Sequence, residues 1–127
     1  MIEMVYSIER RCFVLDKGTY NGFKYVIVSY GTHPCCYIFI PKGHRLYGKS
    51  YEDIDVTCHG GLTFSQDDLC FNPLPNDEWV IGWDYAHYDD YMGYYDMEIM
   101  KKYDHSNNKK WTTKELLEDV KKVIGQL

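Results

Sequence analysis

Apolar residues recur along the chain at two spacings, which predict two kinds of secondary structure. Five runs rich in β-branched and aromatic residues are typical of strands: 12–16, 23–30, 35–40, 55–59 and 78–84. The sequence GTHP after the second run predicts a hairpin turn, and residues 50–54 predict a single helical turn. The pattern therefore predicts a mostly antiparallel sheet of about five strands.

A helical spacing takes over near the end of the sequence. Thr112 and Glu115 form the capping-box pattern that is typical of a helix N-terminus. The apolar positions that follow fall on one stripe: Leu116, Leu117, Val120, Ile124 and Leu127. Such a stripe packs across one face of a sheet. We therefore expect a single α+β domain over residues 1–127, with an amphipathic C-terminal helix on one face of the sheet.

The predicted hairpin at 23–40 is apolar on both faces, so both faces of the sheet should be covered. One helix covers only one of them. The other face could be covered by the N-terminal segment, by the long loop at 66–77, or by a second copy of the chain. We favour the second copy, and therefore expect a homodimer or a larger even homo-oligomer.

Composition narrows the choice of partner. The chain has 127 residues, 17% of them aromatic, including 13 tyrosines, which is more rings than a core of this size needs. The surplus suggests rings that face a ligand or another subunit. The net charge of −5 argues against binding to duplex nucleic acid through many phosphates, but a local basic pocket could still hold a small nucleotide.

The cysteines and the hydropathy pattern suggest a cytoplasmic protein. There are five cysteines, an odd number, and none has the CxxC spacing of a zinc knuckle, so we expect reduced thiols. Adjacent Cys35 and Cys36 would point to opposite faces of a strand, as packing residues do. No apolar run approaches the roughly 20 residues of a membrane span, and we expect no signal peptide.

Histidines and carboxylates occur together in two stretches, CHGGLTF at 58–64 and GWDYAHYDDY at 82–91. Imidazole and carboxylate groups of this kind could hold zinc, manganese or iron: His59, Asp84, His87 and Asp89. The spacing D-x-x-H-x-D matches no recognised metal signature, and the same groups could instead orient a ligand or bond to tyrosine hydroxyls. We favour the second interpretation, with no resident metal, no cofactor and no catalytic residue.

Gly60 and Gly61 have two interpretations. They could form a two-residue hairpin turn between His59 and Leu62, or they could leave space for a ligand. The sequence LTFS that follows is typical of extended chain rather than of a helix. A P-loop or a dinucleotide-binding fingerprint is therefore not present.

Candidate contacts to a nucleotide lie in three further places. Lys109 and Lys110 directly precede Trp111 and the predicted helix start, where free N–H groups and the helix dipole favour a phosphate. The other candidates are residues whose rings could stack on a base or whose polar groups could read a base edge or accept from ribose: Phe71, Asn72, Trp83, Asp84 and Asp89. Phe71 could instead plug the core, and the two lysines could simply be solvated.

Three blocks of the sequence carry a resemblance to a known family. HPCCY at 33–37, HGGLT at 59–63 and WVIGWDYAH at 79–87 resemble the HPCGY, HGGLT and W-x-x-G-[FW]-D-x-x-H blocks of small phage and prophage proteins. Within that set the chain looks like a member of the first phage Thoeris anti-defence family, the signal-molecule sponges. It departs from the family pattern at Cys36, where glycine is usual, and at Tyr85, where a smaller residue is usual.

The resemblance implies a function. It implies a protein of the host bacterial cytoplasm that sequesters glycocyclic ADP-ribose, a cyclic ADP-ribose isomer made by a host TIR-domain enzyme, without cleaving it, in pockets between subunits. Some members are described as holding cyclic trinucleotides at a separate site, which would need phosphate clamps that the three arginines of this chain scarcely provide. The alternative is a metal-dependent, phosphodiesterase-like hydrolase of a small nucleotide that uses His59, Asp84, His87 and Asp89.

Overall fold

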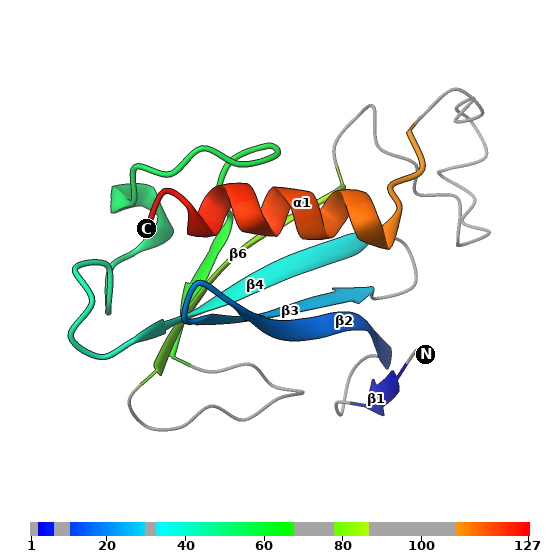
Figure 1. Ribbon diagram of the computed structural model, residues 1–127, viewed down its shortest axis with the longest axis horizontal. Helices are drawn as coiled ribbons and strands as arrows, with labels where there is room; N and C mark the ends of the chain where they lie inside the picture. Colours follow the sequence, from blue (N-terminus) through cyan, green and yellow to red (C-terminus); the bar gives the residue numbers. More distant parts are fainter. Residues whose placement is uncertain (1–2, 7–10, 30–32, 68–77, 87–108) are drawn as a thin grey trace.

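The computed structural model describes residues 3–6, 11–29, 33–67, 78–86 and 109–127 (Figure 1). It contains one six-stranded sheet in the order β1-β2-β3-β4-β6-β5, in which every neighbouring pair is antiparallel. The elements are β1 (Glu3–Tyr6), β2 (Arg11–Tyr20), β3 (Phe23–Ser29), β4 (Pro34–Pro41), η1 (Tyr51–Asp53), β5 (Phe64–Gln66), β6 (Glu78–Asp84) and α1 (Thr113–Ile124). The α+β class, the antiparallel sheet and the helix on one face are confirmed.

One predicted strand is wrong, and two strands of the sheet, β1 and β5, were not predicted. Residues 55–59 do not form a strand; the short edge strand β5 follows them instead. The reason lies in the backbone partners of Thr57. Its N–H donates to Gln126 Oε1 and its carbonyl accepts from Gln126 Nε2, both at 2.7 Å, so a side chain occupies the groups that a strand neighbour would use. The helical turn predicted at 50–54 is confirmed as η1.

A tight turn joins β2 to β3. Asn21 (φ 49°) and Gly22 (φ 84°) both have left-handed backbone, and Tyr20 pairs with Phe23 across the turn. Two left-handed residues in succession match the twist of the flanking strands, and an Asn-Gly pair adopts them at little cost. The turn therefore fixes the register of the two strands. Val14 and Asp16 flank an irregularity further along the same pairing.

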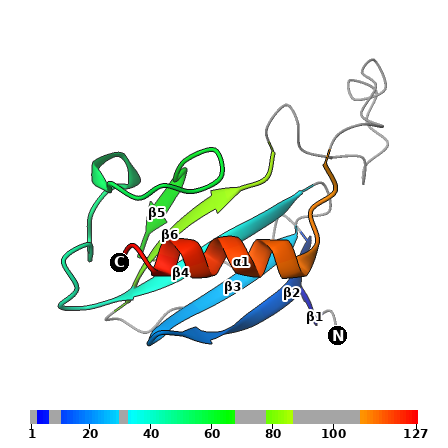
Figure 2. The ribbon, with the colours of Figure 1, turned by 45° about the horizontal axis from the view of Figure 1, so that its top comes forward.

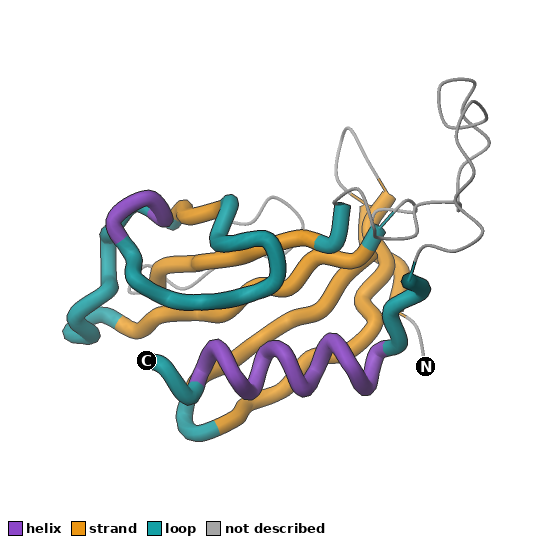
Figure 3. The backbone as a smooth tube through the Cα atoms, turned by 90° about the horizontal axis from the view of Figure 1, so that it is seen from above, coloured by secondary structure: helices purple, strands orange, loops and turns teal. Residues whose placement is uncertain are grey.

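One face of the sheet is covered by α1 together with the loop between β4 and β5. Figure 2 shows α1 lying across β2, β3 and β4, and in Figure 3 the loop lies beside it on the same face. The helix begins at the predicted capping box, where Thr112 Oγ1 accepts from Glu115 N–H at 3.2 Å and Glu115 Oε1 accepts from Thr112 N–H at 3.1 Å. It buries Leu116, Val120, Val123 and Ile124 against the sheet.

The second face of the sheet carries its own apolar cluster. Its buried members are Val14, Val26, Val28, Cys35, Tyr37, Phe39 and Val80. Each is between 0% and 8% exposed in the single chain. Since these side chains are already buried, the apolar second face no longer requires a second copy of the chain. The expected homo-oligomer stays a prediction that rests on the resemblance and on the surplus rings.

Within the described residues, no helix is long and apolar enough to cross a membrane.

Candidate functional site

Three aromatic rings from distant parts of the sequence meet at one end of α1. His59 follows η1, Tyr85 follows β6 and Trp111 precedes α1. The His59 and Tyr85 rings are stacked, with centroids 4.6 Å apart and planes inclined by 11°. The Trp111 ring lies 4.9 Å from each of them, edge-on to His59. We name these three residues the ring cluster. Tyr85 is fully buried, so within the ring cluster a flat ligand could contact the rings of His59 and Trp111.

Tyr85 ties the ring cluster to the core. Its hydroxyl donates to Asp119 Oδ2 at 2.6 Å and accepts from Trp83 Nε1 at 3.1 Å. Trp83, a predicted ligand contact, is only 1% exposed, so its ring packs in the core and reaches the cluster through this bond. Burial raises the pKa of the Tyr85 phenol well above its usual value, and the nearby Cys36 and Asp119 raise it further. The phenol therefore stays neutral, and its O–H donates the hydrogen bond to Asp119.

The turn after Cys58 places His59 on Tyr85. Gly61 N–H donates to the carbonyl of Cys58 at 3.0 Å, and Gly60 and Gly61 have φ of 70° and 83°. This bond closes a tight turn over residues 58–61 with His59 and Gly60 at its centre, so the predicted two-residue hairpin turn at Gly60 and Gly61 is wrong. A Cβ on Gly61 would meet nothing within 4 Å, so the turn also leaves open space. Space for a ligand at this pair stays a prediction.

Lys109 lies on the outer side of the ring cluster. Its ammonium group is 4.2 Å from the centroid of the Trp111 ring and forms an ion pair with Glu115. The hydrogen bond from Lys109, and then that from the Thr112 backbone, lowers the pKa of the Glu115 carboxyl. Glu115 therefore stays charged at the helix start. A ligand phosphate would have to take Lys109 from this carboxylate. Lys110, the other predicted phosphate contact, is exposed next to it.

Asp84 ends β6 close to the turn that carries His59. Its Oδ1 accepts from Ala86 N–H at 3.1 Å, and its Oδ2 accepts from the Thr63 hydroxyl at 3.3 Å. Thr63 N–H in turn donates to the carbonyl of Gly82 at 3.0 Å. Asp84 thus joins the start of β5 to the end of β6. A ribose hydroxyl could replace either of the two donors to Asp84, because a carboxylate oxygen acts only as a hydrogen-bond acceptor.

The structure brings together part of the predicted site. His59, Asp84 and Lys109 lie around the described end of β6 and the start of α1, and Trp83 lies beneath them. Four predicted residues lie outside the described residues: Phe71, Asn72, His87 and Asp89. His87 directly follows Ala86 in the sequence.

Sequence reasoning missed two members of the cluster as site residues, Tyr85 and Trp111, and the anchoring role of Asp119. Trp111 had a usable signal. It occupies the position just before the helix N-cap, where a hydrophobic side chain commonly packs back on the first turn of the helix. The Asp119 contact had none, because a helical carboxylate at a surface-like position reads as solvated.

The thiols near the cluster are poor nucleophiles. Burial raises the pKa of Cys58 to about 11 and raises that of Cys36 well above its usual value. Both thiols are therefore protonated near neutral pH, and it is the thiolate that reacts. Across the described parts of the chain, no group of three or more His, Cys, Asp or Glu side chains is arranged to hold a metal. Two of the four predicted metal ligands, His87 and Asp89, fall outside those parts.

Comparison with known proteins adds no relative to this description: no family model, no curated protein and no solved structure matches the chain.

Proposed function

We propose that the protein is a binding protein that sequesters a small cyclic nucleotide, glycocyclic ADP-ribose, without cleaving it. Acting in the host cytoplasm, it would remove the signal made by a TIR-domain immune enzyme. The observation that carries the proposal is the ring cluster with a lysine over its tryptophan. Rings offer stacking to a base, and a cation beside them suits the phosphates that follow the base. The resemblance of the sequence supplies the identity of the nucleotide.

Binding without turnover is supported by the chemistry of the groups around the cluster. Cys58 and Cys36 are held as thiols, and Tyr85 is held as a neutral phenol that donates a hydrogen bond to Asp119. Groups in these states can pack and donate hydrogen bonds, but they supply neither a thiolate nor a phenolate for attack on phosphorus. Asp84 offers acceptors for ribose hydroxyls.

The charges around the cluster predict a salt-dependent affinity. The chain carries a net charge of −5, so a dianionic ligand is repelled by most of the surface and attracted only locally. Lys109 would exchange Glu115 for a phosphate oxygen, and exposed Lys110 would add a second, more weakly held charge. Exchange of one ion pair for another gains little by itself. Most of the affinity must then come from stacking and burial.

The size of the ligand supports an assembly with pockets between subunits. Glycocyclic ADP-ribose has roughly 35 non-hydrogen atoms, and about 0.3 kcal/mol for each allows nanomolar affinity only if the ligand is almost engulfed. His59 and Trp111 form one wall. A second copy of the chain would supply the opposite one. Light scattering should then give a dimer or a larger even oligomer; a mass near 15 kDa at micromolar concentration would contradict the assembly.

The test is calorimetric titration with synthetic glycocyclic ADP-ribose, followed by heat denaturation and mass spectrometry of the released nucleotide. We expect tight binding and recovery of the intact ligand. Trp111→Ala should weaken binding by about one to two orders of magnitude, because stacking on one base is worth about 1–3 kcal/mol. The matched control is Trp79→Ala, at the far end of β6, about 20 Å along the strand from Tyr85. It should leave the affinity unchanged.

The same titration in a chelator addresses the hydrolase alternative. We expect unchanged affinity in EDTA and no cleavage product with or without added zinc or manganese. Loss of binding in EDTA that one metal restores, together with a linear product, would replace the proposal with the hydrolase. Equal affinity of Trp111→Ala and the unaltered protein would instead move the nucleotide away from the ring cluster.

A further inference from the structure

The turn between β2 and β3 carries the one described residue other than glycine that has a left-handed backbone. Asn21 has a φ of 49°, and Gly22 follows it with a φ of 84°. Such a φ is uncommon outside glycine, and asparagine is among the residue types that adopt it most readily. Both residues are exposed, and no other asparagine of the sequence is followed by glycine. The turn therefore places an exposed asparagine directly before a glycine.

The Asn21 side chain and the Gly22 nitrogen are both accessible. Across the described parts of the chain, neither the Asn21 side-chain amide nor the Gly22 N–H has a hydrogen-bond partner. Gly22 has no side chain, and a Cβ built on it would meet nothing within 4 Å. Neither group is therefore masked by a hydrogen bond, and the space around Gly22 is not crowded.

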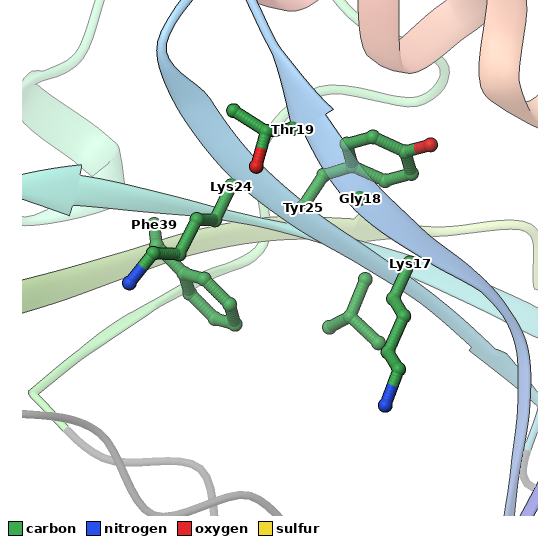
Figure 4. A pocket seen from close by; sticks show the side chains of 7 residues that line it. Lys17, Gly18, Thr19, Lys24, Tyr25 and Phe39 are labelled. Carbon is green, nitrogen blue, oxygen red and sulfur yellow. The ribbon is translucent and has the colours of Figure 1, made fainter.

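The turn lies at the tip of the hairpin, where local opening costs little. Tyr20 pairs with Phe23, and Thr19 pairs with Lys24, on the strands that lead into the turn. Thr19 and Lys24 also line a hollow of about 230 Å³ beside these strands (Figure 4). Packed side chains therefore do not fill this side of the hairpin. A hairpin tip opens at a free-energy cost far below that of global unfolding, so Asn21 can leave its folded conformation while the sheet stays intact.

We propose that Asn21 is a site of spontaneous deamidation, with isoaspartate among the products. The Gly22 backbone nitrogen loses its proton to hydroxide and attacks Cγ of Asn21. A bond forms between this nitrogen and Cγ, the bond from Cγ to the side-chain nitrogen breaks, and that nitrogen takes a proton from water and leaves as ammonia. Water then opens the cyclic imide at either of its carbonyl carbons, which gives aspartate or isoaspartate at position 21. The sequence of steps consumes one water molecule and regenerates the hydroxide.

Isoaspartate changes the length of the turn. It moves one side-chain carbon into the backbone and leaves a charged carboxylate in place of a neutral amide. A two-residue turn matches the twist of its strands only with its normal backbone length. The pairing of Tyr20 with Phe23 is therefore the first to be lost.

Tyr20 and Phe23 connect the turn to the C-terminal end of α1. The Lys121 ammonium group lies 5.4 Å from the centroid of the Tyr20 ring. The Phe23 ring packs edge-on against the His44 ring at 5.5 Å, and His44 Nε2 lies 3.3 Å from the carbonyl oxygen of Leu127. Loss of the Tyr20–Phe23 pair should therefore loosen the end of α1. The ring cluster lies at the other end of this helix, so the modification site is separate from the proposed nucleotide site.

The test is incubation of the full chain at mildly alkaline pH beside a synthetic peptide of residues 19–24, with peptide mapping and isoaspartyl methyltransferase labelling of both. We expect modification of Asn21 in both, slower in the protein by less than about a hundredfold, a factor that reports the opening of the turn. A higher pH should accelerate both reactions, because the Gly22 nitrogen must lose its proton. The matched control is Asn21→Gly, which keeps two residues that tolerate a left-handed backbone and should stay unmodified.

The structural consequence is tested on modified protein that has been separated by ion exchange. Amide hydrogen exchange at Tyr20, Phe23 and residues 121–124 should rise at least about tenfold relative to Asn21→Gly incubated in the same way. Exchange at the start of α1 should stay the same in the two proteins.

Three outcomes would overturn the proposal. A reaction in the protein that is more than about a hundredfold slower than in the peptide means that the turn holds Asn21 closed. Aspartate without isoaspartate means that water attacks the side chain directly and that no cyclic imide forms. Unchanged exchange at Tyr20 and Phe23 in the modified protein means that the turn accommodates the extra backbone carbon. None of these outcomes affects the nucleotide titration, so the two proposals fail separately.

Discussion

Removal of one oxygen atom, in Tyr85→Phe, should destabilise the protein more than its size suggests. The hydroxyl is the only atom lost, and the ring can keep its place against His59 and Trp111. The loss breaks two bonds at once, the donation to Asp119 Oδ2 at 2.6 Å and the acceptance from Trp83 Nε1 at 3.1 Å. The indole N–H of Trp83, a residue that is 1% exposed, then loses the acceptor that Tyr85 provided.

The magnitude follows from these two bonds. A hydrogen bond to a charged group contributes about 1.5–3 kcal/mol, and a buried donor without a partner costs about 1–3 kcal/mol. Asp119 recovers part of its loss because its carboxylate is only partly buried and can turn to water. We therefore expect the free energy of unfolding to fall by about 2–4 kcal/mol. For a chain of this length that lowers Tm by about 8–15 °C.

The assay is urea denaturation followed by circular dichroism, with a thermal melt of the same preparation. The matched control is Tyr47→Phe, at a half-buried ring packed on Trp79, for whose hydroxyl the described residues provide no hydrogen bond. The control should change stability by less than about 0.5 kcal/mol. If Tyr85→Phe is as stable as the control, the bonds to Asp119 and Trp83 contribute nothing and the reasoning fails. The double variant with Asp119→Asn should cost less than the sum of the two single changes.

Three further predictions concern Cys58, Gln126 and Gly82. The raised pKa of Cys58 stabilises the fold below pH 9, and this contribution is lost between pH 9 and about 11; urea denaturation of Cys58→Ala should show a shallower loss over that window. Gln126→Ala removes the hydrogen-bond partner of both backbone groups of Thr57. The rate of amide hydrogen exchange at Thr57 should therefore rise at least tenfold, which corresponds to a loss of about 1.4 kcal/mol of local stability. Gly82→Ala would place a Cβ 2.5 Å from the Tyr37 ring and 2.9 Å from a backbone oxygen, and should cost about 1–3 kcal/mol in urea denaturation; an unchanged midpoint would contradict that packing.

The sequence predicted well those elements whose own residues indicate which of their faces are buried. The hairpin of β3 and β4 is apolar at nearly every position, as a strand covered on both faces must be. The α1 capping box and stripe are local patterns of a few residues. Residues 55–59 failed for the opposite reason. They have strand-forming composition, but a glutamine far along the sequence takes the backbone groups of Thr57, and no local pattern encodes that partner.

The site was predictable only in part, for a related reason. Histidine, aspartate and lysine were selected by chemical type, and three of them lie where the end of β6 meets the start of α1. What the residue types did not predict is how they are already used. Lys109 holds Glu115, Asp84 joins two segments, and Trp83 is buried. Whether a charged or aromatic residue near a site can contact a ligand depends on the partners that it already has within the fold.

Tyr85 would couple binding of the proposed nucleotide to the stability of the fold. His59 stacks on the Tyr85 ring, and the Tyr85 hydroxyl donates to Asp119 of α1, the helix that covers the core. A ligand in contact with His59 would stabilise the folded state as a whole, by an amount that follows from its concentration and its Kd. The reverse also holds, since a change at Tyr85 alters the platform beneath His59 without touching the ligand. Trp111 is half-buried and packs within the ring cluster, so Trp111→Ala probes binding while the bonds of Tyr85 to Asp119 and Trp83 stay in place.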